Sequence, residues 1–283
     1  MTEHNRVIRG DCSLVLETLM EGSVDAVVCD PPYGLGTKQP SPEEIAHYLE
    51  GSRLNTGGDF MGRDWEIPPV SVWRKCFRAL KPGGLLLAFA GSRTFDVMDV
   101  GIRAAGFEPV TTLAWIYGSG FPKSLNVGKA LAKLERKEAA EKWAGWGTAL
   151  KPSWEPILCF RKPGPESPLD LGVPFFYTGK ANRSDRNDGL EDTENSHVTV
   201  KPTALMRWLI RIACPKGGLV LDPYAGSGST LVAAAEEGMD FLGIEIDPVY
   251  FEVASKRASS LVARRETRET EADIFARMMD GDF

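Results

Sequence analysis

Short apolar runs alternate with longer amphipathic stretches along most of this chain, and this alternation constrains the fold more than any other feature. Val24–Cys29 has the length of one buried strand and ends at Asp30 and two prolines, whereas 203–213 repeats apolar residues at helical spacing. Strands alternating with helices predict an α/β fold with a doubly wound, parallel sheet. The runs assigned to strands are Val7–Ile8, Val24–Cys29, Leu85–Phe89, Val110–Ile116, Pro156–Arg161, Leu219–Leu221 and Phe241–Ile246.

Three stretches break this rhythm. Residues 34–68 are rich in Gly, Pro and polar groups and read as a long loop, and 162–196 reads the same way. Residues 118–150 begin with a Gly/Ser/Pro turn, followed by a basic helix expected at about 126–142. Long loops in compact domains are commonly functional, so substrate specificity is expected in 118–150 and 162–196.

Composition excludes several classes of protein. The chain has 283 residues, 43% of them hydrophobic, which is enough for a sizeable core. No apolar run approaches the roughly 20 residues of a membrane span, and the polar start of the chain lacks a signal-peptide core. Five scattered cysteines without metal-ligand spacing indicate a reduced, metal-free protein of the cytoplasm. The net charge of −6 excludes a uniformly basic surface, although a local basic face stays open.

A glycine-rich turn follows the strand at 219–221. Gly226 and Gly228 allow a tight turn and a close approach of backbone to a ligand. Glu245 ends the next strand, where a carboxylate is suited to the hydroxyls of a ribose. The turn lacks both GxGxxG and the lysine of a phosphate-binding loop, which disfavours dinucleotides and nucleoside triphosphates. The turn and Glu245 together favour a cofactor that contains adenosine.

A second motif, Asp30-Pro31-Pro32-Tyr33, follows the buried strand 24–29. The prolines fix the backbone and remove two N–H donors, which leaves the Asp30 carboxylate and the Pro31 carbonyl as acceptors beside the Tyr33 ring. Acceptors next to an aromatic face suit the amino group of a planar base. A plain proline turn with a buried tyrosine is the alternative interpretation of these four residues alone.

Together the two motifs resemble those of the class β S-adenosylmethionine-dependent DNA amino-methyltransferases, in which the catalytic motif precedes the cofactor motif. Further matches lie at 10–12, 197–202 and 243–245, and the resemblance covers most of 5–262. Val198 and Tyr224 depart from the usual Pro and Phe without removing a polar contact.

The resemblance implies a Rossmann-like methyltransferase fold with a mostly parallel seven-stranded sheet, permuted motif order and small inserted recognition segments. It divides the chain into a catalytic half (1–117), inserted segments with the candidate target-recognition region (118–196), a cofactor half (197–262) and a charged tail (263–283).

The resemblance also implies roles for individual residues, with no metal ligand. Asp30, Pro31, Pro32 and Tyr33 would be catalytic. Residues matching the family's S-adenosylmethionine site are Asp11, Cys12, Thr199, Lys201, Pro202, Asp222, Pro223, Tyr224, Ala225, Gly226, Ser227, Gly228, Ser229, Thr230, Glu245 and Asp247. Asp11 would meet the cofactor's adenine, Glu245 its ribose, and the glycine turn, Thr199, Lys201 and Pro202 its methionine end.

Double-stranded DNA is the expected partner, with a homodimer as a further expectation. Residues 119–162 hold nine Lys and Arg against four Glu, which favours phosphate contacts there, although a solvated helix with mixed charges explains the same pattern. Trp143, Trp146 and Trp154 are expected in the core. The candidate DNA-binding residues are Lys123, Lys129, Lys133, Arg183 and Arg186.

Several functions stay open at this point. The Asp of the tetrad favours transfer to adenine N6, and cytosine-N4 is the nearest rival. Related enzymes that modify RNA or protein amides usually open the tetrad with Asn. A nucleotide-binding oxidoreductase would need a GxGxxG near its start, and a DNA-binding relic would be expected to have lost Asp30 or the glycine turn.

Overall fold

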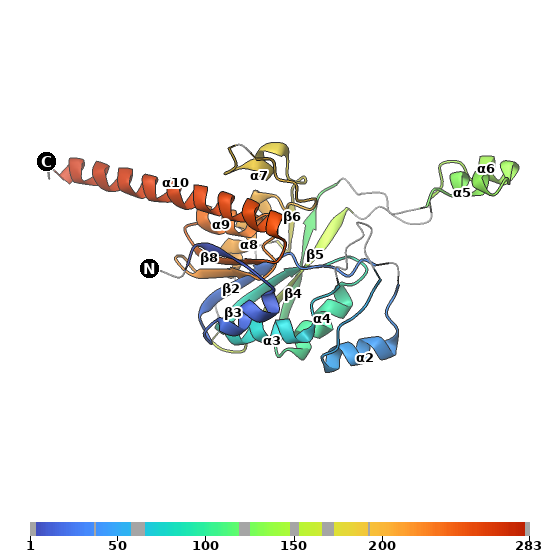
Figure 1. The fold of residues 1–283 in the computed structure, drawn as a ribbon, viewed down its shortest axis with the longest axis horizontal. Helices are drawn as coiled ribbons and strands as arrows, with labels where there is room; N and C mark the ends of the chain where they lie inside the picture. The colour runs from blue at the N-terminus through green and yellow to red at the C-terminus, as the bar shows by residue number, and fades with distance from the viewer. Residues whose placement is uncertain are drawn as a thin grey trace.

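The computed structural model describes residues 4–36, 38–57, 66–118, 125–147, 153–165, 173–191 and 193–280. Within these ranges, strands from both ends of the chain form one eight-stranded sheet in the order β1-β8-β7-β2-β3-β5-β4-β6 (Figure 1). The strands are β1 (Arg6–Arg9), β2 (Val24–Cys29), β3 (Leu80–Phe89), β4 (Glu108–Ile116), β5 (Trp154–Arg161), β6 (Phe175–Tyr177), β7 (Leu219–Asp222) and β8 (Asp240–Glu245).

The sheet is mostly parallel, as expected. Only β5 runs antiparallel to its neighbours β3 and β4. Its register places Glu155 opposite Trp115. On the other side of β3, β2 lies parallel to both β3 and β7. Because β2 precedes Asp30 and β7 precedes the glycine turn, both motifs leave the sheet at neighbouring carboxyl ends, where open α/β sheets bind their ligands.

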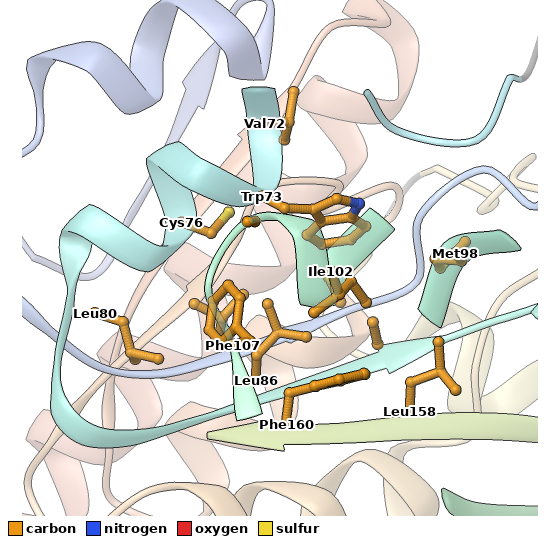
Figure 2. Close-up of a cluster of buried hydrophobic side chains, with 14 of the residues drawn as sticks. Val72, Trp73, Cys76, Leu80, Leu86, Met98, Ile102, Phe107, Leu158 and Phe160 are labelled. Carbon is orange, nitrogen blue, oxygen red and sulfur yellow. The ribbon is translucent and has the colours of Figure 1, made fainter. Parts of the chain in front are cut away.

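Helices cover both faces of the sheet. Against one face, α1 (Cys12–Thr18), α2 (Pro42–Glu50), α3 (Val70–Ala79) and α4 (Phe95–Ala104) pack over a buried cluster. Figure 2 shows part of this cluster, with Trp73 of α3 and Ile102 of α4 near Phe160 of β5. Against the other face lie α8 (Thr203–Ala213), α9 (Ser229–Glu236) and the start of α10 (Pro248–Asp280). The apolar helical spacing of 203–213 is thus explained, since α8 buries Leu205, Met206, Leu209, Ile210 and Ala213.

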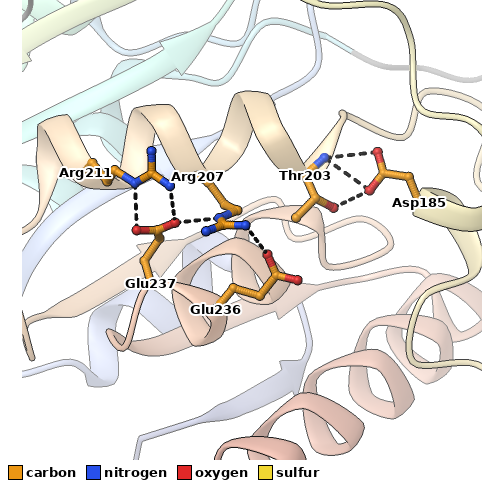
Figure 3. Close-up of polar contacts among 6 residues, drawn as sticks. All are labelled: Asp185, Thr203, Arg207, Arg211, Glu236 and Glu237. Carbon is orange, nitrogen blue, oxygen red and sulfur yellow. Dashed lines mark hydrogen bonds and ion pairs between the residues drawn. The ribbon is translucent and has the colours of Figure 1, made fainter.

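The polar side of α8 is held to its neighbours by charged contacts (Figure 3). Arg211 donates two hydrogen bonds of 2.7 Å to the Glu237 carboxylate after α9, and Arg207 donates a third. These hydrogen bonds, led by those of Arg211, lower the pKa of Glu237 to about 2. At the start of α8, the backbone N–H of Thr203 donates to Asp185 of α7 (Arg183–Asn187) at 3.1 Å. The segment around α7 is therefore tied to the helix that follows it.

The prediction that 34–68 and 162–196 are loops throughout was wrong. In the first stretch, α2 starts at a capping box, in which Ser41 and Glu44 each accept a hydrogen bond from the other's backbone N–H. This Ser-Pro-Glu-Glu start is a helix signal that the Gly and Pro content around it obscured. In the second stretch, β6 pairs with β4 and raises the strand number from the expected seven to eight. Three residues are too few for a periodicity to be recognised.

The basic helix expected at about 126–142 is two short helices, α5 (Val127–Lys133) and α6 (Lys137–Lys142). Glu135 has a φ of 59°, a left-handed conformation that ends one helix before the next begins. The pair packs together and stands apart from the sheet in Figure 1. Trp143 and Trp146, expected in the core, form an edge-to-face pair there and are 41% and 62% exposed. Trp154 at the start of β5 is also exposed.

Two smaller differences concern element ends. β3 begins at Leu80, so the Lys-Pro-Gly-Gly segment expected to precede the strand belongs to it. The last helix, expected from Val249 to about Val262 and followed by a charged tail that is helical or frayed, runs as one helix to Asp280. Within the described ranges, no helix is both long and apolar enough to cross a bilayer. No group of three or more His, Cys, Asp or Glu side chains that could hold a metal ion occurs in that same part of the chain.

Candidate active site

Asp30 and Tyr33 are held together at the carboxyl end of β2. The Tyr33 hydroxyl lies 2.7 Å from Asp30 Oδ1. The backbone of Tyr33 is fixed as well, because the Thr94 hydroxyl donates to its carbonyl at 2.6 Å. Pro31 and Pro32 between them restrict the turn. The tetrad predicted as catalytic is therefore one local unit, with its acid and its ring fixed relative to each other.

Two residues from distant elements complete this unit. Lys201, just before α8, places Nζ 2.6 Å from Asp30 Oδ2 and 3.1 Å from the Tyr33 hydroxyl. Glu155 of β5 places Oε2 2.9 Å from the same hydroxyl and 3.3 Å from Lys201 Nζ. Lys201 was predicted to bind the cofactor, and Glu155 was not predicted as a site residue. The antiparallel pairing of β5, which brings Glu155 to this site, leaves no signal in a single sequence.

Burial and charge fix the protonation of this cluster. Burial raises the pKa of Tyr33 well above its usual value, and the charges of Asp30 and Glu155 raise it further. For Lys201, burial alone would lower the pKa, but the attraction of Asp30 and Glu155 outweighs burial and raises it. At neutral pH the site thus holds a neutral phenol and a charged ammonium.

The glycine turn after β7 has the geometry expected of a site where a ligand meets backbone. Gly226 and Gly228 adopt left-handed φ angles of 53° and 83°, and Gly228 caps the start of α9. A Cβ at Gly226 would lie 3.0 Å from His197 Nε2, and one at Gly228 would lie 3.2 Å from the backbone of Ala254. Side chains at these two positions are therefore disfavoured by both conformation and space.

Asp222 is hydrogen-bonded to residues on both sides of this turn. Its Oδ1 accepts a 2.9 Å hydrogen bond from the backbone N–H of Tyr224, and the Thr230 side chain hydrogen-bonds to it. The side chain is fully buried, and this burial raises its pKa to about 7, although both hydrogen bonds oppose the rise. Asp222 thus stabilises the conformation of the glycine turn through hydrogen bonds within the protein.

Two further carboxylates predicted to bind the cofactor lie at neighbouring strand ends. Glu245, the last residue of β8, accepts hydrogen bonds from the N–H groups of Gly226 at 2.7 Å and Asp247 at 2.8 Å. Burial raises the pKa of Glu245, with partial compensation by these bonds. Asp11 follows β1 and caps α1 by accepting from Ser13 N at 2.7 Å. Both carboxylates are fixed in position because they accept hydrogen bonds from backbone N–H groups.

A cavity of about 240 Å³ is lined by these two carboxylate residues and by Pro32 of the tetrad. Its wall includes predicted residues and others that were not predicted, several of which come from the stretch 34–68 that was assigned to a loop. The predicted residues are Asp11, Cys12, Pro32, Pro223, Tyr224 and Glu245, and the missed ones include Arg53, Glu66, Ile67, Pro68, Pro69 and Val72. A cavity whose wall combines apolar side chains with the carboxylates of Asp11, Glu66 and Glu245 suits an aromatic base and a ribose, whose amino and hydroxyl groups donate hydrogen bonds.

Other predicted cofactor residues lie around the glycine turn. Cys12 contributes a thiol whose pKa burial raises to about 11, so it stays neutral beside Tyr224. The hydroxyl of Ser229, at the start of α9, is buried and has no hydrogen-bond partner in the described structure. Such an orphaned polar atom fits a ligand that supplies the missing bond. Ala225, Ser227 and Pro202 are buried in this region, whereas Thr199 is exposed.

The predicted DNA-binding residues divide into three groups. Lys123 lies outside the described residues. Lys129 and Lys133 lie on α5 in the exposed helix pair. Arg183 is exposed and paired with Glu194, whereas Arg186 donates its hydrogen bonds to the backbone carbonyls of Asn195 and His197. Arg186 is thus engaged inside its own loop.

Comparison with known proteins identifies relatives over most of the chain. The family model described as DNA methylase (N6/N4 methyltransferase) matches residues 24–256. The type II methyltransferase M.HindIII of Haemophilus influenzae is 26% identical, over 89% of this chain and 94% of its own. The DNA adenine methyltransferase YhdJ of Escherichia coli is also 26% identical, over 90% of this chain and 83% of its own.

Solved structures share the fold. TTHA0409 of Thermus thermophilus, in complex with S-adenosyl-L-methionine, is 24% identical with a TM-score of 0.54, over 91% of this chain and 95% of that one. The cytosine-N4-specific PvuII DNA methyltransferase is 18% identical with a TM-score of 0.62, over 97% and 92% of the two chains. The family match spans both motifs and the strands that carry them. The chain therefore belongs to the N6/N4 DNA methylase family, and its cofactor is S-adenosylmethionine.

Proposed function

We propose that this protein transfers a methyl group from S-adenosylmethionine to the N6 amino group of adenine in double-stranded DNA. The observation that carries this proposal is the fixed pair of Asp30 and Tyr33, which lies beside the cavity lined by Asp11 and Glu245. An acidic acceptor next to an aromatic ring suits a planar base that carries an amino group. The similarity to YhdJ, which is named an adenine methyltransferase, favours adenine over cytosine.

The residues fit the cofactor as follows. Glu245 would accept hydrogen bonds from the ribose hydroxyls, and Asp11 from the adenine amino group. The glycine turn and the unpartnered Ser229 hydroxyl would lie at the methionine end. When bound, S-adenosylmethionine supplies a methyl group on a positively charged sulfur.

The target base needs activation, because the lone pair of an aromatic amino nitrogen is delocalised into the ring. Hydrogen bonds from that amino group to the Asp30 carboxylate and the Pro31 carbonyl would localise the lone pair on nitrogen. The base must also leave the duplex, since its amino group lies inside the stack. Tyr33 would stack on the flipped base. Catalysis then consists mainly of positioning and electrostatics, and no covalent enzyme intermediate is needed.

The DNA backbone would be held mainly by the basic residues of α5, Lys129 and Lys133, with Lys123 before it. Arg183 is available for a further contact because it is largely exposed. We further propose that the protein works on DNA in the cytoplasm, as a homodimer.

Long-read sequencing tests the proposal directly. DNA is taken from cells that express either the wild-type protein or Asp30→Ala. We expect adenine methylation within one short sequence motif with the wild type and none with the variant. Methylation on cytosine alone would show that cytosine, not adenine, is the target base, and the reaction would still be methylation of DNA. Absence of any DNA methylation, with cofactor binding intact, would direct the search to RNA or protein amides.

A further inference from the structure

The Lys201 ammonium is surrounded by the catalytic unit. An ammonium group has three N–H donors, and three acceptors lie around this one: Asp30 Oδ2 at 2.6 Å, the Tyr33 hydroxyl at 3.1 Å and Glu155 Oε2 at 3.3 Å. The side chain is only 7% exposed. Its hydrogen-bonding capacity is therefore used within the catalytic unit and is not directed to the methionine end of the cofactor.

Three aromatic rings enclose the same ammonium. Its Nζ lies 4.8 Å from the ring centroid of Phe89, 5.4 Å from that of Tyr33 and 5.8 Å from that of Trp115. These distances are within the range of cation–π attraction, which strengthens when the cation is desolvated. Phe89 and Trp115 are themselves buried and packed edge to face. The rings and the carboxylates together hold the Lys201 side chain in one place.

The cluster is unbalanced in charge. Asp30 and Glu155 contribute two carboxylates against one ammonium, and Asp222 and the buried Cys29 thiol also face Asp30. Tyr117 faces Glu155 and Lys201 from the end of β4. Tyr33 has a single hydroxyl proton, which can be donated to only one of the two carboxylates at a time. Lys201 therefore places a positive charge between the Asp30 and Glu155 carboxylates, where it offsets the repulsion between them.

We propose that Lys201 and Glu155 are positioning residues for the methyl transfer, which hold the Asp30 carboxylate and the Tyr33 ring in fixed positions. This inference rests on the proposed function, since it assigns Asp30 to the amino group of the target base. Lys201 secures one oxygen of Asp30 directly. Glu155 anchors Lys201 and Tyr33 from the antiparallel strand β5.

The test compares Lys201→Met with the wild type in steady-state methylation of DNA across a range of pH. Loss of the ammonium leaves two facing carboxylates, which then retain a proton at higher pH. We expect kcat to fall at least about tenfold near neutral pH, with the dissociation constant for S-adenosylmethionine within about twofold of the wild type. The acidic limb of kcat/KM should move upward by about one pH unit or more.

The double variant Lys201→Met with Glu155→Gln distinguishes the loss of a compensating charge from a general disruption of the site's structure. Removal of the second carboxylate should return the acidic limb toward the wild-type pH, although kcat stays low. Lys81→Met is the matched control. Lys81 of β3 forms an ion pair of 2.6 Å with Asp25, which lies near the start of β2, at the end opposite to Asp30. This control should keep the wild-type profile. Lys201→Gln replaces Lys201→Met if the methionine variant does not fold.

The outcomes separate the inference from the proposed function. A wild-type protein that methylates no DNA overturns the proposed function itself. An active wild type combined with an unmoved acidic limb in the single Lys201 variant overturns the positioning role. Loss of cofactor binding in that variant would also overturn it, and would return Lys201 to the methionine end of the cofactor. A shifted limb that Glu155→Gln restores supports the inference.

Discussion

The backbone N–H of Gly226 donates a 2.7 Å hydrogen bond to Oε2 of Glu245, 19 residues later in the chain. The bond joins the glycine turn after β7 to the end of β8, so the two parts of the candidate cofactor site share one carboxylate. A ribose that binds Glu245 is therefore recognised by a group whose position depends on the turn.

Replacement of Glu245 tests this link. Glu245→Gln weakens the acceptor for both backbone N–H groups and for the ribose hydroxyls. We expect the dissociation constant for S-adenosylmethionine to rise about 10- to 100-fold, which corresponds to the loss of one or two charge-assisted hydrogen bonds. Isothermal titration calorimetry measures the change. Glu252→Gln on the exposed side of α10 serves as the control, and equal affinities in the two variants would contradict the assignment.

The buried Asp222 predicts an unusual pH dependence of stability. Its pKa in the folded protein is about 7, above the ordinary value of 3.8 for an aspartic acid side chain, so the folded state binds the proton more tightly than the unfolded state. The stability that this proton contributes is fully present below about pH 4 and is lost as the pH rises through about 7. Above that range, the fold carries a buried, ionised carboxylate.

Asp222→Asn removes the ionisation while keeping an acceptor for Tyr224 N. We expect the variant to exceed the wild type in free energy of unfolding by roughly 2–4 kcal/mol at about pH 8, with the difference fading toward about pH 4. Urea denaturation at several pH values provides the measurement. Glu21→Gln, at an exposed site, should show no such trend. A difference that is constant across the pH range would rule out the explanation by ionisation.

Gly101 is required where α4 meets α2. A Cβ at this position would lie 2.2 Å from the Tyr48 hydroxyl, which donates to the carbonyl of Pro68 at 2.9 Å. Gly101→Ala should therefore displace Tyr48 and destabilise the protein by about 1–3 kcal/mol. Pro68 lines the cofactor cavity, so affinity for S-adenosylmethionine should fall as well.

Thermal unfolding and cofactor titration of Gly101→Ala check both expectations. Gly179→Ala is the control, because a Cβ there would meet nothing within 4 Å. If Gly101→Ala behaves like this control, the close packing of Tyr48 against α4 is not important for stability.

The basic residues on α5 predict a measurable salt effect. If Lys129 and Lys133 each neutralise a DNA phosphate, the double alanine variant should reduce the slope of log binding constant against log salt by about 2. Fluorescence anisotropy with a labelled duplex gives this slope. Lys216→Ala, at the amino end of β7, should leave the slope unchanged. A weaker but equally salt-dependent complex would argue against direct phosphate contacts.

Much of the scaffold could be predicted from the sequence because strands and helices of this length leave strong periodic patterns. Val24–Cys29 and 203–213 were predicted with the bounds that the structure gives. Elements of three to nine residues in Gly- and Pro-rich surroundings were missed, as α2 and β6 show. Their formation depends on a local cap or on pairing with a neighbouring strand, and neither produces a long periodic pattern.

The candidate site likewise contains residues that could be predicted from the sequence and one that could not. Recognisable motifs at or just after strand ends contain Asp30, Tyr33, Gly226 and Glu245. The structure brings these residues to the same edge of the sheet. Glu155 had no such signal, because it lies within a strand and reaches the site only through antiparallel pairing. Two partners separated by 122 residues, Tyr33 and Glu155, meet through tertiary structure alone.

Transfer of a labelled methyl group to a DNA duplex, followed by digestion to nucleosides, tests the central claim most directly. The wild type and Asp30→Ala are compared at equal occupancy by S-adenosylmethionine, established by titration. We predict label in N6-methyladenine with the wild type and a loss of at least about a thousandfold in rate with the variant. Equal rates for the two proteins, or label in the wild-type reaction only outside adenine, would contradict the assignment of Asp30 to the adenine amino group.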